Sequence, residues 1–188
     1  AKAFARYKFR GQNISYGAIM IPFLIPEIIL AVAVLVIWLS LGFKLGLVPV
    51  TIGHTLFVTP FAMLILIARI EGFDFSLEEA SRDLGENAWG TFFRVSLPLY
   101  LPGIVAALLL SFIISFDEFV LAFFLTGSDA TLPMYMWAQM RFIQKLPHVL
   151  ALGACIIVAT TFIVLLAFWL RNLGQGKGKT ELGINIHE

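Results

Sequence analysis

The sequence predicts an all-α integral membrane protein. Of its 188 residues, 60% are hydrophobic and only 13% are charged, against about 25% charged in an average soluble domain. The mean hydropathy is +0.92. Three long stretches contain no Asp, Glu, Lys or Arg, and a fourth follows Glu27. A helix needs roughly 20 mostly apolar residues to cross about 30 Å of hydrocarbon. Four membrane-spanning helices are therefore expected, at about 15–42, 49–69, 99–125 and 148–171.

The basic residues indicate on which side of the membrane each connection lies. Ten of the 13 Lys and Arg residues precede the first span, separate the second from the third, or follow the fourth. Since positive residues favour cytoplasmic connections, both ends of the chain and the segment 72–98 are expected in the cytoplasm. The segment 132–145 is expected outside, as a surface or re-entrant element. The Gly-rich tail 174–188 is expected to be a flexible cytoplasmic extension.

The segment 72–98 interrupts this apolar chain with charge. Ser76 followed by Glu79 is a capping-box pattern, which predicts a helix beginning at Leu77. Gly85 permits the positive φ that ends such a helix. The first predicted helix is amphipathic, with its apolar residues three and four positions apart.

A second short helix is predicted directly after the first. Asn87 can cap its start, and Pro98 is expected to stop it before the next span. From periodicity alone, two interpretations stay open. Such helices can lie on the membrane surface, or they can dock onto a partner protein.

The residue identities favour docking. The stretch "EEASRDLG", nine residues and then "VSLP" resembles the EAA loop of binding-protein-dependent ABC importer permeases. That loop reads Glu-Ala-Ala, three residues, Gly, nine residues and Ile-x-Leu-Pro. The matching residues are Glu79, Ala80, Gly85, Leu97 and Pro98. Ser81 stands in place of the second Ala, and Val95 in place of the Ile.

The likeness extends over almost the whole chain. "GHTLFVTPFAMLILIARIEGFD" before the loop and "PGIVAALLLSFIISFDEFVLAFFLTGSDATLP" after it are similar to the spermidine/putrescine-type branch of this family. Its members have six spans in the methionine-importer-like permease fold. The resemblance therefore implies that two further spans precede residue 1.

The resemblance also implies what the loop does. In the family it docks into a groove on a cytoplasmic ATPase subunit and moves with it. A docked helix needs an apolar ridge and a polar rim. The ridge would comprise Leu77, Ala80 and Leu84, the rim would comprise Glu78, Glu79, Arg82 and Asp83, and Gly85 would supply the bend.

Three acids interrupt the predicted spans, namely Glu27, Asp117 and Glu118. A charge near the bilayer centre costs about 2.5–3.5 kcal/mol on insertion scales, so such residues usually face a cavity or a partner. One interpretation is a pathway for a cationic solute. The other is structural, with each acid at the interface, against an Arg of a partner subunit, or at a helix end beside a proline.

No residues predict catalysis or metal binding by this chain. The sequence contains no Walker-type loop and no nucleophile–base pair. His54 has no Cys or carboxylate at metal-ligand spacing, so it is interpreted as a helix-packing hydrogen bonder. No cofactor is therefore expected in the chain itself. The resemblance implies that ATP and Mg²⁺ are bound by the partner ATPase.

The sequence is accordingly interpreted as a multi-pass permease subunit in a bacterial inner membrane. The implied partners are a second permease subunit, two ATPase subunits, a periplasmic or lipid-anchored solute-binding protein and membrane lipid. Nothing suggests nucleic acid. Import would proceed by alternating access, with a polyamine as the favoured solute.

Several alternatives stay open. The same importer class also carries opines, aminophosphonates, ferric iron and other small solutes. A chain lacking two family spans could be a truncated, non-transporting membrane protein. An autonomous secondary transporter or channel is a third possibility, and it would work without any ATPase.

Overall fold

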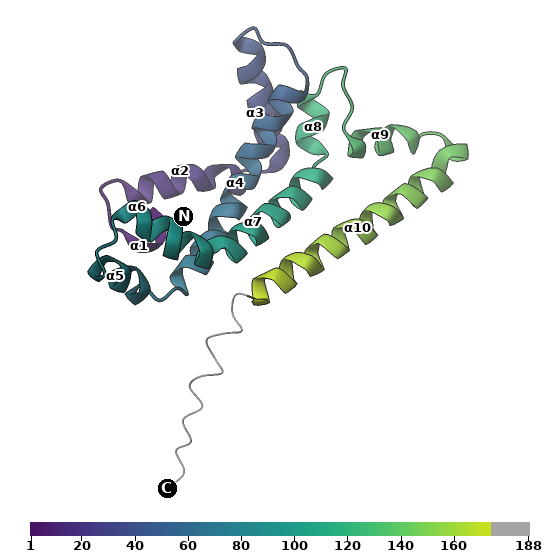
Figure 1. Ribbon diagram of the computed structural model, residues 1–188. Coiled ribbons are helices and arrows are strands. Elements are labelled where there is room, and N and C mark those ends of the chain that lie inside the picture. The colour runs from purple at the N-terminus through teal and green to yellow at the C-terminus, as the bar shows by residue number, and fades with distance from the viewer. Residues whose placement is uncertain (174–188) are drawn as a thin grey trace.

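The computed structural model describes residues 1–173, and all the regular structure within them is helical (Figure 1). The predicted tail 174–188 lies outside the described residues. The helices are α1 (Lys2–Arg6), α2 (Gln12–Leu24), α3 (Glu27–Ser40), α4 (Leu47–Glu71), α5 (Ser76–Asp83), α6 (Ala88–Thr91), the π-helix η1 (Phe92–Ser96), α7 (Leu97–Asp117), α8 (Val120–Leu125), α9 (Leu132–Gln139), the 3₁₀ turn η2 (Ile143–Lys145) and α10 (Leu146–Leu173).

The long helices α4 and α7 form the centre of the molecule. α10 packs along α7, while α3 and α8 pack against each other and against α4. A buried apolar cluster joins these last three helices and comprises Leu30, Ala31, Val50, Leu121, Ala122 and Leu125. Within the described residues, three helices are long and apolar enough to cross a membrane, or four if α2 and α3 count as one bent span.

The first expected span is broken rather than continuous. α2 and α3 meet at an angle of 106°, with Ile25 extended and Pro26 next to it. The prediction of one helix over 15–42 was wrong at this point. A proline has no N–H to donate, and it disfavours helical geometry in the residue before it. The break places Glu27 in the first turn of α3.

The third expected span begins earlier and ends earlier than predicted. α6, η1 and α7 follow one another in a continuous helical run over Ala88–Asp117. Pro98 therefore does not stop the second loop helix, because it lies in the first turn of α7, where its missing N–H is tolerated. The run ends at Glu118, whose backbone is extended. A separate helix, α8, replaces the predicted continuation to residue 125.

The remaining expected elements are present as helices. α4 and α10 match the second and fourth predicted spans to within a few residues, and α9 with η2 lies in the predicted segment 132–145. Figure 1 shows α1, α5 and α6 together at one end of the molecule, the α5 end, and α9 at the other, the α9 end.

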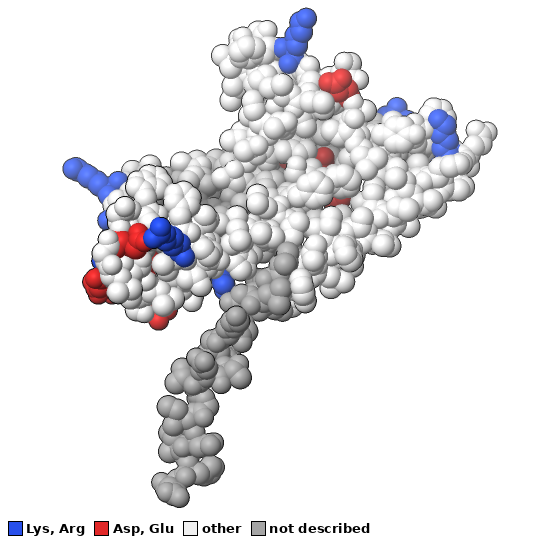
Figure 2. Space-filling model, viewed as in Figure 1, with Lys and Arg blue, Asp and Glu red and all other residues white. Residues whose placement is uncertain are grey.

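Charge follows the same division. In Figure 2 most Lys, Arg, Asp and Glu side chains gather at the α5 end, at the tip of α3 and near α9, and the surface between these places is largely uncharged. Large apolar side chains on the described part of α10 are exposed, Phe162 and Trp169 among them. An uncharged middle with exposed apolar side chains fits a hydrocarbon surrounding.

A substitution at Gly53 is expected to disturb the central packing. A Cβ at this position in α4 would lie 2.8 Å from Cδ1 of the fully buried Leu125. Gly53→Val should therefore cost about 1–3 kcal/mol through overpacking, seen as a lower midpoint of thermal unfolding. Gly17→Val is the control, since nothing lies within 4 Å of a Cβ there. Equal midpoints for the two variants would contradict this packing.

Candidate functional site

α5 forms where the sequence predicts it, but its start is capped differently. The predicted Ser76–Glu79 capping box is not made, since no side chain caps the helix from its N-cap position, Phe75. Instead, Asp74 Oδ1 accepts a hydrogen bond of 3.0 Å from the backbone N–H of Ser76. This bond holds the pKa of Asp74 below its usual range, because it stabilises the ionised carboxylate.

The outward face of α5 carries the predicted apolar ridge. Leu77 is 46% exposed and Leu84 is 87% exposed, although both are large apolar residues. Ala80 between them is exposed as well, as are the rim residues Glu79, Arg82 and Asp83. Gly85 ends the helix with φ +91°, as expected. This face therefore has the composition of an interface with no partner on it.

Glu78 does not lie on the exposed rim, so this part of the prediction was wrong. Its side chain is only 1% exposed. The reason is a set of donors that the sequence spacing does not reveal. Lys2 and Arg6 of α1 form ion pairs with it: Lys2 Nζ lies 2.7 Å from Oε1, and Arg6 Nη1 pairs with Oε2.

Two hydroxyl groups complete the surroundings of this carboxylate. Ser96 Oγ donates to Glu78 Oε1 at 2.5 Å, and the Tyr100 hydroxyl donates to the same oxygen at 3.2 Å. We call Glu78, Lys2, Arg6, Ser96 and Tyr100 the Glu78 cluster. Charged hydrogen bonds of this kind are stronger than neutral ones. A buried carboxylate that loses its partners typically costs about 3–5 kcal/mol.

Aromatic rings surround the two cations of the cluster. The Arg6 guanidinium carbon lies 4.5 Å from the centre of the Phe75 ring. Lys2 Nζ lies 5.8 Å from the ring centres of both Phe92 and Tyr100. Ring faces attract cations, so these contacts hold α1 against the loop together with the ion pairs.

The second loop helix is attached to the first through small polar groups. Asn87 caps α6 as predicted, since its side-chain oxygen accepts from the Gly90 N–H at 2.8 Å. Between the helices, the hydroxyls of Ser81 and Thr91 are 3.2 Å apart, and both residues are buried. Ser81, which replaces an Ala of the family pattern, thus contributes a hydrogen bond that Ala cannot make.

At the other end of α7, two of the three predicted acids come together. Glu27 at the start of α3 and Glu118 after α7 are close enough for their side chains to share a hydrogen bond. Glu118 is 7% exposed, and its Oε1 accepts from the Leu121 N–H at 2.9 Å. It therefore also caps the first turn of α8.

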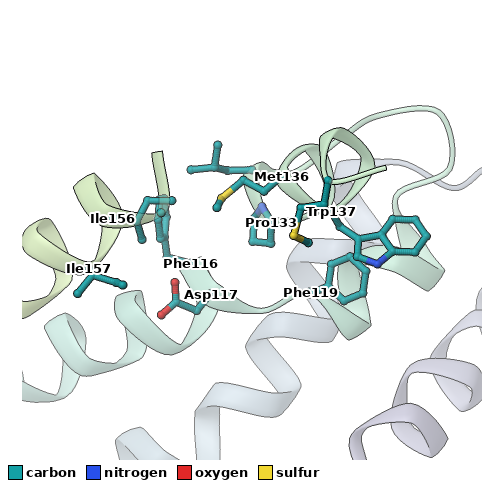
Figure 3. Close-up of a pocket in the computed structure, with 11 residues that line it drawn as sticks. Phe116, Asp117, Phe119, Pro133, Met136, Trp137, Ile156 and Ile157 are labelled. Carbon is teal, nitrogen blue, oxygen red and sulfur yellow. The ribbon is translucent and has the colours of Figure 1, made fainter. Parts of the chain in front are cut away.

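Asp117 lies apart from this pair, in a pocket of about 360 Å³ between α7, α9 and α10. Figure 3 shows its carboxylate pointing into the pocket, with Pro133 and Met136 of α9 across from it, while the Trp137 ring lies to the side against Phe119. Apart from this carboxylate, the residues of the pocket shown in Figure 3 are largely apolar and aromatic. Arg141 stacks on Trp137, with its guanidinium carbon 4.3 Å from the ring centre.

His54 has the packing role expected for it. Its Nδ1 lies 2.9 Å from Ser115 Oγ, joining α4 to α7. A groove of about 420 Å³ runs beside it, with Thr51, Thr55, Thr59 and Ser111 among its lining residues. Within the described chain, His54 Nε2 and Ser111 Oγ are buried and have no hydrogen-bond partner. Sequence reasoning did not identify this polar groove, although its residues recur at helical spacing.

The bend at Gly85 is expected to require glycine. Its φ of +91° is in the left-handed region, and nothing lies within 4 Å of an added Cβ. Gly85→Ala should therefore cost about 1–2 kcal/mol through backbone strain alone, and Gly85→Asn less, since Asn adopts this region more easily. Amide hydrogen exchange of residues 76–91 would measure the loss. Equal exchange in the wild type and the Ala variant would contradict it.

Comparison with known proteins gives a consistent result. Residues 2–175 match the model of the family described as "Binding-protein-dependent transport system inner membrane component". The chain is 32% identical over 181 residues to the spermidine/putrescine transport system permease protein PotC of Escherichia coli K12, covering 96% of this chain and 68% of that protein.

Two further relatives are permease proteins named for other transport systems. The putrescine transport system permease protein PotI of Escherichia coli K12 is 30% identical over 170 residues, which cover 87% of this chain and 60% of that protein. The molybdenum transport system permease protein ModB of Haemophilus influenzae is 27% identical over 194 residues, covering 92% of this chain and 85% of that protein. With the EAA-type loop and the membrane-length helices in place, the chain belongs to the inner-membrane permease family of binding-protein-dependent ABC importers.

Proposed function

We propose that this chain works as a permease subunit of an ATP-driven importer that moves a polyamine inward. The observation that carries the choice of solute is the set of three acids, Glu27, Asp117 and Glu118. None of them forms an ion pair among the side chains that the structure describes. Acids at membrane depth that lack a basic partner attract cations and repel anions.

The pocket around Asp117 supports a solute with an ammonium group. It joins one carboxylate to aromatic and apolar side chains, and its volume of about 360 Å³ is in the range of small-molecule sites. The Asp117 carboxylate would hold the ammonium group, because one face of the Trp137 ring is already covered by Arg141. The methylene groups of a polyamine would contact the apolar side chains.

The relatives agree with this choice only in part. Two of them are named as polyamine permeases, whereas a third is named for molybdenum. Import of an anion is therefore the second candidate, along with import of another small solute. The unpaired acids favour the cation, since an oxyanion beside them would have to overcome repulsion.

The exposed face of α5 supports docking onto an ATPase subunit. Leu77, Ala80 and Leu84 form the apolar ridge, and Glu79, Arg82 and Asp83 surround it. Glu78 is excluded from this surface, because it is buried within the chain itself. The ATPase partner would bind ATP and Mg²⁺, and this chain would contribute neither residue nor cofactor to hydrolysis.

The α5 end, with both ends of the chain, would lie in the cytoplasm. α9 would lie on the outer side of the membrane, where it would face the binding protein and the second permease subunit.

The positions of the helices indicate how ATP binding would open the pathway. Four residues connect α4 to α5, and α6 continues through η1 into α7. A movement of α5 would thus act directly on the central pair of helices. The 21 residues of α7 span roughly 32 Å. Asp117 is the last residue of this helix and Glu118 follows it, so both lie at the end of α7 that is far from the loop. Partners would shift the balance between inward-open and outward-open states.

Leu84→Asp is expected to weaken docking strongly. The residue is 87% exposed, so the folded subunit should change in stability by no more than about 0.5 kcal/mol. A charge in an apolar contact should nevertheless lower the recovery of the ATPase subunit with the purified permease at least about tenfold. Leu84→Met is the control, since it keeps an apolar side chain. Unchanged recovery of the ATPase with the Asp variant would speak against this docking surface.

Asp117→Asn is expected to lower the apparent affinity for the solute. Because Asp117 is exposed in its pocket, the loss should be about tenfold, equivalent to about 1.4 kcal/mol. The measurement is the concentration dependence of putrescine and spermidine uptake by the reconstituted complex. Asp129→Asn, in the loop between α8 and α9, is the control. An unaltered concentration dependence would remove Asp117 from the pathway.

The function itself is tested with the full-length subunit and its co-encoded partners in lipid. ATP hydrolysis is followed as the binding protein is added with putrescine, spermidine, molybdate or a neutral solute. Stimulation by polyamines alone is the expected result. Stimulation by molybdate or the neutral solute would leave an importer with a different solute. Stimulation by none would contradict import.

A further inference from the structure

Glu78 joins segments that are far apart in the chain. Its carboxylate accepts from Lys2 and Arg6 on α1, from Ser96 in η1 and from Tyr100 on α7. Glu78 itself is on α5, the helix that carries the exposed ridge. One buried side chain of the loop between the second and third spans thus contacts both α1, which precedes the first span, and the start of the third span.

α1 depends on this carboxylate for its position. The helix has only five residues, none of them buried, and helices this short are not stable by themselves. Its two cations are nevertheless largely covered, with Arg6 17% and Lys2 29% exposed. They are attached through Glu78 and through the rings of Phe75, Phe92 and Tyr100.

Two helical routes lead from the Glu78 cluster into the membrane. Along one, Ser96 and Tyr100 belong to the continuous run that ends at Asp117. Along the other, α1 connects through Gly11 to α2 and then to α3. The routes meet again at the α9 end of α7, where Glu27 of α3 and Glu118 contact each other. The loop is therefore connected to Glu118 through α7 and to Glu27 through α1, α2 and α3.

We propose that Glu78 is a positioning residue of the importer, through which movement of α5 is passed to α1 and the α2–α3 span as well as to α7. The role rests on the proposed function, because it presupposes that α5 is moved by an ATPase. Because its side chain is only 1% exposed, Glu78 would touch neither the ATPase nor the solute. It sets the position of α1 relative to the loop.

The test compares Glu78→Gln with the wild type in the full complex reconstituted in lipid. Glutamine keeps the size of the side chain but removes the charge that holds both cations. Amide hydrogen exchange of residues 2–6 and 76–83 is expected to become at least about tenfold faster in both segments. Uptake of putrescine per ATP hydrolysed is expected to fall at least about fivefold. Glu71→Gln, an exposed acid at the end of α4, should change neither quantity.

A charge exchange separates positioning from simple stabilisation. The double variant Arg6→Glu/Glu78→Arg keeps one acid and two bases in the cluster, so it should restore slow exchange and coupled uptake together. Slow exchange without recovery of coupled uptake would reduce Glu78 to a stabilising contact and overturn the proposal. Unchanged exchange in Glu78→Gln would overturn it too, as would unchanged uptake per ATP.

The exchange measurement also separates this proposal from the proposed function. If the wild-type complex took up no solute at all, import would be refuted. The exchange of residues 2–6 and 76–83 would still decide whether Glu78 holds α1 to the loop, since it does not depend on transport.

Discussion

The structure depends on one buried carboxylate, Glu78, and on the charges that neutralise it. An acid that is 1% exposed is stable only when donors replace the water it has lost. Here the donors come from three segments outside its own helix. Satisfying Glu78 therefore fixes α1, α5 and the start of α7 relative to one another. It also turns the apolar ridge of α5 outward, because Leu77 lies about 100° around the helix from Glu78.

A second constraint acts at the opposite end, where backbone breaks place the acids. Pro26 interrupts the first span just before Glu27, and the extended backbone at Glu118 ends α7. Polar groups are tolerated at membrane depth where the helix is interrupted within protein or beside a cavity. Each break therefore both creates a place for an acid and brings it near the other. The central pair α4 and α7 links these breaks to the loop, so the two sites are parts of one helical framework.

The sequence predicted most of the helices. Long uncharged stretches predicted α4 and α10 directly, since hydrophobic length depends on no partner. Gly85 and Asn87 were also predicted correctly, because a left-handed turn and a helix cap are local features. The errors concern Glu78, Pro98, the Ser76 cap and the continuity of the first and third spans. The burial of Glu78 depends on distant donors that local pattern does not reveal. The break of the first span, by contrast, follows from Pro26 and its effect on Ile25.

The sequence by itself determined that the chain is helical and membrane-spanning and that it carries an EAA-type loop, since composition, hydrophobic length and motif spacing are properties of the chain alone. Only the tertiary structure decided which loop acid is exposed. Glu78 and Glu79 are adjacent and chemically identical, yet Lys2 and Arg6, more than 70 residues away, bury the first of them. It likewise brought Glu27 to Glu118 while leaving Asp117 in a separate pocket. Long-range contacts between charged groups have no periodicity in the sequence, so they arise only when the helices pack.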